Sequence, residues 1–314
     1  KPMGFASASL WNQRLALAAS GGRLRALHTA VGHGSDLSFD QLTQLAAAAL
    51  EFKPDLILEL GRNKGNSTCA FTEAANQLGP ERCRVVSLCD SDSWDKSRPS
   101  SIASVVPETW FKPLRTCSGN ILDFDYESIV GTAQRVLVFW DAHGFDVAEC
   151  VLGRILPLLV ERTHLVIMHD LSDARYIPSE SADYGDNPLW RGGSSPGVRV
   201  RLGNVDSAVE QAVAIVDFTS RNRLTLHSAD DDIQTVLFGN SYKLREMKDV
   251  LNVDAYSPQA HWFYFSLNEH PGPYTFPKPR MRSPLKSSFG KEGWRHRVLR
   301  RLRTAASRLI PKNH

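Results

Sequence analysis

Seven short apolar runs alternate along this chain with longer segments of helical periodicity. The runs are DLILEL (55–60), RVVSLCD (84–90), PLRTCSG (113–119), RVLVFWD (135–141), HLVIMHD (164–170), RLTLHSA (223–229) and HWFYFSL (261–267). Helix-compatible segments separate most of them, at 67–78, 146–161, 206–220 and 233–251. Strands of a parallel sheet are buried on both faces and therefore read as continuous apolar runs. The pattern predicts an α/β fold with a doubly wound, mostly parallel seven-stranded sheet and helices on both faces. The last two runs, joined through 233–251, can also close the sheet antiparallel.

The rest of the chain suggests one large domain with two extensions. With 314 residues, 42% of them hydrophobic and 23% charged, and no repeating tract, the chain is neither fibrous nor wholly disordered. FDQLTQLAAAALEF (39–52) has helical spacing, with Ser38 as a plausible N-cap and Pro54 after its end. Pro and Gly residues break the periodicity of 171–205, which predicts a lid or binding loop; they include Pro178, Pro188, Gly192, Gly193, Pro196 and Gly197. We expect a helical extension over 1–34, the α/β domain over 35–275 and a tail over 276–314.

Cysteine usage and hydropathy bear on the compartment. The five cysteines form no CxxC pair and no metal-finger spacing, which favours reduced thiols in a cytoplasmic protein without structural zinc. No uncharged apolar stretch approaches the ~20 residues that a membrane-spanning helix needs. We therefore expect neither secretion nor a membrane span.

A glycine-containing turn follows the first run. DLILELGRNKGNS (55–67) places Glu59 at the end of a strand, then Gly61 and Gly65, and then Ser67 at the start of a helix. Free backbone amides at such a helix start favour a carboxylate or phosphate. The next run ends in Asp90, where a carboxylate can hold ribose hydroxyls. Together these features favour a nucleoside-bearing cofactor.

Other interpretations of this segment remain open. An ordinary strand–glycine–helix turn occurs in many α/β proteins. NAD is less attractive because the G-x-G-x-x-G spacing is absent. Asp92 competes with Asp90 for the ribose, since CDSDSWD (89–95) offers several acids, and these acids can equally belong to a solvated loop.

The segment ELGRNKGNS resembles the first motif of class I S-adenosylmethionine-dependent methyltransferases. It is most similar to the family 24 group, which includes sugar and antibiotic O-methyltransferases and cephalosporin hydroxylase-like proteins. RVLVFWDAHGF (135–145) and LVIMHDL (165–171) fall where that group carries its later motifs. The match covers about 39–270. It implies the strand order 3-2-1-4-5-7-6 and S-adenosyl-L-methionine as cofactor.

The resemblance also implies roles for single residues. Glu59, Gly61, Gly65 and Ser67 would line the methionine part of the cofactor, and Asp90 would hold the ribose. The adenine would contact residues that follow the third run, namely Asn120 and Ile121, and Asp141 after the fourth run would also contact the cofactor.

A candidate catalytic group lies at the ends of the fourth and fifth runs. Asp141 and His143 follow one strand, and His169 and Asp170 end the neighbouring one, so all four are expected at the same edge of the sheet. Asp141 and Asp170, with His169, would bind a divalent cation such as Mg²⁺, and His143 would act as general base on the acceptor hydroxyl.

Simpler roles exist for the same residues. Asp141 and Asp170 can merely cap the following helices, and a buried, hydrogen-bonded His169 is favoured over a ligand. The sequence also departs from the family pattern. A third oxygen ligand beside Asp170 is missing, and the Asp-to-His spacing in DAH is one residue shorter than usual.

The charge is divided unevenly along the chain. Residues 278–314 carry 12 Lys and Arg against one acid, a net charge of +11, which leaves −8 for residues 1–277. Within WRHRVLRRLRTAASRLI (294–310), apolar residues recur at helical spacing among arginines. Such a segment favours an anionic membrane surface, ahead of a partner or self-packing, and nucleic acid least.

These features lead to one primary function and two alternatives. The primary expectation is an O-methyltransferase acting on a hydroxyl of a sugar, glycan or natural-product acceptor, peripheral at the inner membrane surface. The alternatives are a non-catalytic cofactor-fold protein tethered to a membrane or partner, and a nucleic-acid methyltransferase, although no NPPY-like motif follows the fourth run. The acceptor and the oligomeric state, a homo-oligomer included, stay open.

Overall fold

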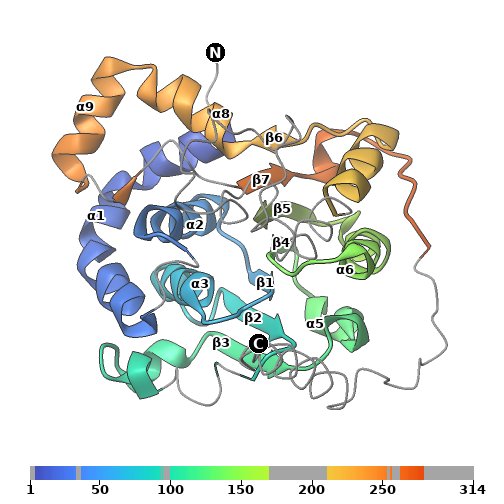
Figure 1. Ribbon diagram of the computed structural model, residues 1–314, viewed down its shortest axis with the longest axis horizontal. Helices are drawn as coiled ribbons and strands as arrows, with labels where there is room; N and C mark the ends of the chain where they lie inside the picture. The colour runs from blue at the N-terminus through green and yellow to red at the C-terminus, as the bar shows by residue number, and fades with distance from the viewer. Residues whose placement is uncertain are drawn as a thin grey trace, which may run out of the picture. The chain divides into compact units, whose positions relative to one another are not determined.

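The computed structural model describes residues 4–32, 37–92, 94, 100–169, 211–252, 255–256 and 262–278 (Figure 1). The chain divides into two compact units, residues 1–278 and 279–314. The second unit, the expected lid at 171–205 and Asp170 lie outside the described residues.

The centre of the first unit is a seven-stranded sheet with the order β3-β2-β1-β4-β5-β7-β6. The strands are β1 (Leu56–Leu60), β2 (Arg84–Cys89), β3 (Leu114–Ser118), β4 (Arg135–Trp140), β5 (Thr163–His169), β6 (His227–Ser228) and β7 (Trp262–Phe265). The first five pair in parallel, and β7 runs antiparallel to both β5 and β6. The predicted fold class and strand order are therefore confirmed, including the antiparallel closure.

Helices cover both faces of the sheet (Figure 1). One face carries α1 (Phe5–Val31), α2 (Phe39–Phe52) and α3 (Asn66–Leu78), and the other carries α5 (Tyr126–Val130), α6 (Phe145–Cys150) and a helix over 211–221. Successive strand side chains point to opposite faces. Accordingly, Ile57 of β1 packs with α2 and α3, whereas Leu56 and Leu58 pack with α5 and α6.

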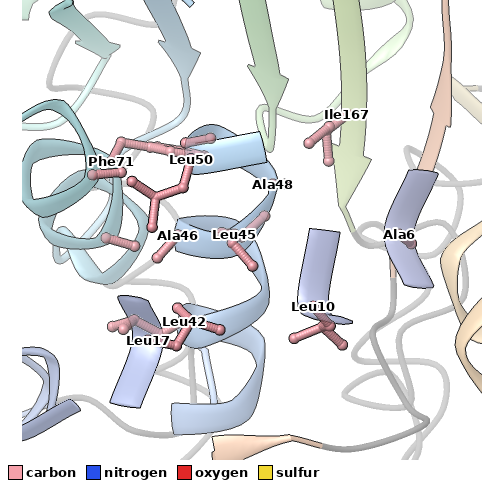
Figure 2. Close-up of a cluster of buried hydrophobic side chains, with 14 of the residues drawn as sticks. Ala6, Leu10, Leu17, Leu42, Leu45, Ala46, Ala48, Leu50, Phe71 and Ile167 are labelled. Carbon is pink, nitrogen blue, oxygen red and sulfur yellow. The ribbon is translucent and has the colours of Figure 1, made fainter. Parts of the chain in front are cut away.

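The N-terminal helix α1 is part of this core. Its apolar side chains pack on α2, and Figure 2 shows Leu17 of α1 beside Leu42 of α2. The first turn of α1 is held by residues that lie more than 200 positions later in the sequence. Tyr264 accepts a hydrogen bond from the backbone N–H of Phe5, and the Asp232 carboxylate accepts from the backbone N–H groups of Gly4 and Ser7. Residues 5–31 thus belong to the helical layer that covers one face of the sheet.

The ends of α2 follow the signals in its sequence. The backbone N–H of Ser38, the predicted N-cap, donates to the Gln41 side chain at 3.0 Å, as in a capping box. Lys53 adopts a left-handed conformation just before Pro54, and α2 ends there.

Two predicted helices are divided in the structure. The segment 146–161 contains α6, a π-helical turn (Val151–Ile155) and a 3₁₀ turn (Leu156–Leu159), consistent with Pro157 lacking a backbone donor. The segment 233–251 contains the end of α8 (Ala229–Ile233), a π-helical turn (Gln234–Phe238) and α9 (Ser241–Val250), with Asn240 capping the start of α9. Within the described ranges, no helix is long and apolar enough to cross a membrane.

Candidate functional site

Glu59 lies in β1 and is completely buried. Its carboxylate accepts hydrogen bonds from the hydroxyls of Ser67 at 2.5 Å, Thr68 at 2.6 Å and Ser87. Burial raises the pKa of Glu59, while these hydrogen bonds and the nearby Arg62 guanidinium oppose the shift. Glu59 therefore holds the first turn of α3 against β1 and β2. Direct contact of Glu59 and Ser67 with a cofactor stays a prediction.

Gly61 and Gly65 of the motif both have a positive φ of 97°. At each glycine, another part of the chain occupies the space that a side chain would need. A Cβ atom on Gly61 would lie 2.7 Å from the carbonyl carbon of Asp141, so the turn after β1 lies directly against the end of β4. A Cβ atom on Gly65 would lie 2.1 Å from Cζ3 of Trp94. The structure thus gives each glycine a packing reason, and their contacts with a cofactor stay predictions.

The ends of β2 and β3 bring the predicted nucleoside residues to one edge. Asp90 follows β2 and is exposed, as is its rival Asp92. Asn120 follows β3 and is exposed, and its side chain accepts from the backbone N–H of Leu122. Ile121 is 7% exposed and belongs to the core beneath. The two strands are joined here by a hydrogen bond from Gly119 N–H to the Cys89 carbonyl at 2.8 Å.

Asp141 and His169 meet at the ends of β4 and β5. His169 Nδ1 lies 3.2 Å from Asp141 Oδ1, and the side chains of His169 and Asp141 are 1% and 13% exposed. His143 follows two residues after Asp141 and is exposed. The expected convergence of Asp141 and His169 is therefore present, and the buried His169 with a carboxylate partner matches the simpler of its two predicted roles.

The donor set for a cation is small among the described residues. No group of three or more His, Cys, Asp and Glu side chains suited to a metal occurs within those ranges. The described members of the predicted metal set are the Asp141 carboxylate and the His169 imidazole hydrogen-bonded to it, and these two do not make the oxygen set that Mg²⁺ prefers. The cation therefore stays a prediction that depends on Asp170.

Two residues at this edge were missed by sequence reasoning. Arg62, in the turn after β1, is 1% exposed, and Trp94, in the acid-rich segment after β2, is 2% exposed. A cation in a glycine-containing turn and a tryptophan among acids both suggest exposed positions. No local signal marks either as buried, because their partners come from other strands and helices.

No family model and no curated protein matches the chain. Solved structures with a similar fold include three methyltransferases. The SAH-bound methyltransferase PaMTH1 of Podospora anserina has a TM-score of 0.46 at 14% identity, covering 76% of this chain and 86% of its own. The O-methyltransferase TomG of Streptomyces achromogenes, involved in tomaymycin synthesis and in complex with SAM, scores 0.40 at 19% identity, covering 64% and 80%. The O-methyltransferase of Bacillus cereus in complex with SAH scores 0.39 at 14% identity, covering 64% and 82%. Because each of these TM-scores is below 0.5, the function of this chain has to be argued from its own residues.

Proposed function

We propose that the chain is an S-adenosylmethionine-dependent O-methyltransferase acting on a hydroxyl of a sugar, glycan or natural-product acceptor. The observation that carries the proposal is the arrangement of one sheet edge. The turn around Gly61 and Gly65, the exposed Asp90 and Asn120, and the Asp141–His169 pair all follow strands of a sheet with the order expected from the motif resemblance. Ligands of open α/β sheets bind at the carboxyl ends of the strands.

The cofactor would lie over β1, β2 and β3. Its ribose would bind Asp90, and its adenine would lie near Asn120. The methionine part would lie near the turn between β1 and α3. Glu59 holds the start of α3 in place through Ser67 and Thr68. The reacting methyl group would then face the end of β4, because Gly61 lies directly against the backbone of Asp141.

The chemical step is a displacement at the methyl carbon. The acceptor oxygen forms a bond to this carbon as the carbon–sulfur bond breaks, and the sulfonium becomes a neutral thioether. The hydroxyl proton passes to His143, which is exposed at this edge, because an imidazole is suited to accept a proton near neutral pH. Asp141, held by His169, orients the acceptor. No step is assigned to a metal, and Mg²⁺ at Asp141, His169 and Asp170 is a separate prediction.

Calorimetry with S-adenosylhomocysteine tests the cofactor assignment. The wild-type protein should bind, Asp90→Asn should weaken binding by about tenfold or more, and the matched Asp92→Asn variant should bind normally. If only Asp92→Asn weakens binding, the ribose residue is Asp92 instead. Absence of binding by the wild-type protein would reject the proposed function.

Transfer of a labelled methyl group to a panel of sugar and natural-product acceptors tests catalysis. His143→Ala should lose most of the transfer while keeping cofactor affinity, and near-normal turnover of this variant would eliminate His143 as the base. The same assay with EDTA, and with Mg²⁺ restored, tests the cation. Unchanged transfer in EDTA would remove Mg²⁺ from the proposal.

A further inference from the structure

Arg62 is a buried cation in the turn between β1 and α3. Its side chain is only 1% exposed, although the turn lies at the edge of the sheet. A buried guanidinium is costly unless hydrogen bonds compensate its charge. Its burial therefore needs a structural reason, and its contacts supply one.

The guanidinium reaches β2 and β3, the two strands that follow β1 toward one side of the sheet. Nη1 donates to the backbone carbonyl of Ser87 at 2.7 Å and to the Ser87 hydroxyl at 3.2 Å, both in β2. Nη2 donates to the hydroxyl of Ser118, the last residue of β3, at 3.2 Å. A single side chain that starts beyond β1 thus spans the ends of β2 and β3.

These contacts continue to both halves of the proposed cofactor site. On one side, the Ser87 hydroxyl donates to Glu59, which holds the start of α3, and the Arg62 carbonyl accepts from the Gly65 N–H at 2.8 Å. On the other side, the Ser118 hydroxyl lies 3.4 Å from the carbonyl of Ser91, the residue after Asp90. The connected groups therefore run from the glycine turn to the segment that carries the predicted ribose ligand.

We propose that Arg62 is a positioning residue that sets the spacing between the ends of β2 and β3, and hence the nucleoside half of the cofactor site. The inference rests on the proposed function. Arginine suits this task because its planar, forked guanidinium can donate to two strands at once, whereas lysine offers a single nitrogen. Arg62 need not touch the cofactor, because it acts through Ser118 and the backbone beside Asp90.

Arg62→Lys is the principal variant, and Arg84→Lys is its matched control. Arg84 lies at the opposite end of β2, where its guanidinium donates to the carbonyls of Ile129 and Val130. Both variants keep the charge and lose guanidinium hydrogen bonds to backbone carbonyls, which lie in α5 for Arg84, but only Arg62 lies at the proposed site. Affinity for S-adenosylhomocysteine is measured by calorimetry at a temperature where all three proteins are folded.

We expect Arg62→Lys to weaken S-adenosylhomocysteine binding about tenfold and Arg84→Lys to leave it within about twofold. Competition by 5′-methylthioadenosine, which lacks the amino-acid part, should show the same fold-loss, because the nucleoside half is affected. The cofactor KM should rise while kcat at saturating cofactor changes little. A general loss of structure would not produce this division between KM and kcat.

Ser118→Ala provides a second, milder variant that keeps the Arg62 contacts to β2 and removes the Ser118 hydroxyl, which contacts both Arg62 and the Ser91 carbonyl. It should weaken methylthioadenosine binding about threefold. Normal binding by both Arg62→Lys and Ser118→Ala would overturn the inference while leaving the proposed function intact. A loss confined to S-adenosylhomocysteine and absent with methylthioadenosine would also overturn it, since Arg62 would then act on the methionine half. If the wild-type protein binds neither compound, the proposed function fails first.

Discussion

The indole of Trp94 occupies the space that a side chain on Gly65 would need. The Cβ position of Gly65 is 2.1 Å from the indole ring, and φ at Gly65 is 97°. Trp94 is itself 2% exposed and packs in a cluster with Cys69, Leu27 and Trp110. Two separate penalties, backbone strain and a steric clash, therefore oppose any larger residue at position 65.

Gly65→Ala should destabilise the fold by more than the ~1–3 kcal/mol expected of backbone strain alone. In a Trp94→Ala background the clash disappears, so the same substitution should cost only the strain. Urea unfolding of the two single variants and the double variant measures this coupling. Strictly additive costs would show that the ring and residue 65 do not interact.

Burial of Glu59 predicts a dependence of stability on pH. Because the folded-state pKa of Glu59 is raised above its ordinary value of 4.5, the folded state binds more protons than the unfolded state over this interval. The contribution of Glu59 to stability is fully present below about pH 4.5 and is lost as pH rises through the folded pKa. Relative to wild type, Glu59→Gln should therefore gain in free energy of unfolding as pH rises from 4 to about 8. A difference that stays constant over urea titrations in this range would contradict the burial argument.

At the scale of elements, α1 begins with a cap from another helix. Gly4, its N-cap residue, has no side chain, and Asp232 of α8 supplies the acceptors instead. Asp232 accepts from the backbone N–H groups of Gly4 at 3.1 Å and Ser7 at 2.8 Å, and from the Ser7 hydroxyl at 2.7 Å. A carboxylate here also faces the positive end of the helix dipole.

Asp232→Ala should lower the free energy of unfolding by about 1–2 kcal/mol, as loss of a helix cap does. Hydrogen exchange should accelerate at the first amides of α1. Asp231→Ala is the control, because Asp231 is exposed on the same helix. Equal effects of the two variants would argue against a specific cap.

His164 joins the start of β5 to the turn after β7. Its Nε2 accepts the backbone N–H of Leu267 at 2.9 Å, and its Nδ1 lies 2.9 Å from the Arg162 carbonyl, so the ring is neutral with the proton on Nδ1. Burial lowers the pKa of His164, although the backbone contacts oppose this shift. Protonation would remove the acceptor that Leu267 uses.

The sign of the resulting pH effect follows from that lowered pKa. The unfolded state binds a proton near pH 6.5 and the folded state only at lower pH, so stability falls as pH drops below 6.5. His164→Gln should be less stable than wild type at pH 7.5, and the difference should shrink at about pH 5.5. Thermal unfolding of both proteins at the two pH values measures this stability difference. A difference that is larger at acid pH would contradict the predicted role of His164.

At the scale of the whole molecule, the division of charge corresponds to the division into units. The candidate site lies within residues 1–278, and the basic segment proposed to bind an anionic membrane lies in 279–314. The last described residues are anchored in the first unit, since Thr275 N–H donates to Asn222 and Phe276 stacks on Phe218. A break after residue 278 therefore leaves these contacts in place.

Removal of 279–314 should leave the melting temperature and the S-adenosylhomocysteine affinity unchanged and should abolish binding to vesicles that contain anionic lipid. Full-length protein with neutral vesicles is the control for charge, since each basic residue near the surface contributes about 1 kcal/mol only with anionic lipid. Lost cofactor binding in the shortened chain would show that the tail belongs to the fold. Retained vesicle binding would place the membrane contact elsewhere.

Much of the fold could be predicted because its signals are local. The apolar runs, the capping of α2 at Ser38 and the glycine turn depend on neighbouring residues, and the structure confirms the strands and their order. The divided helices at 146–161 and 233–251 were not predicted, because both contain enough apolar spacing to resemble single helices. For the site, the pattern placed the candidate residues at the ends of the strands, and their roles stay predictions, but it did not identify Arg62 or Trp94 as buried.

Local sequence was enough for the alternation of strands and helices, and for placing Glu59, Asp90 and Asp141 at or directly after the carboxyl ends of β1, β2 and β4. Backbone preference and hydrophobic period act over a few residues, so they can be read along the chain. The tertiary structure alone decided that Arg62 bridges to Ser118, that Trp94 fills the space at Gly65 and that Asp141 pairs with His169. These contacts join residues 28 to 56 positions apart, and their energy depends on burial and distance, which exist only once the strands have assembled.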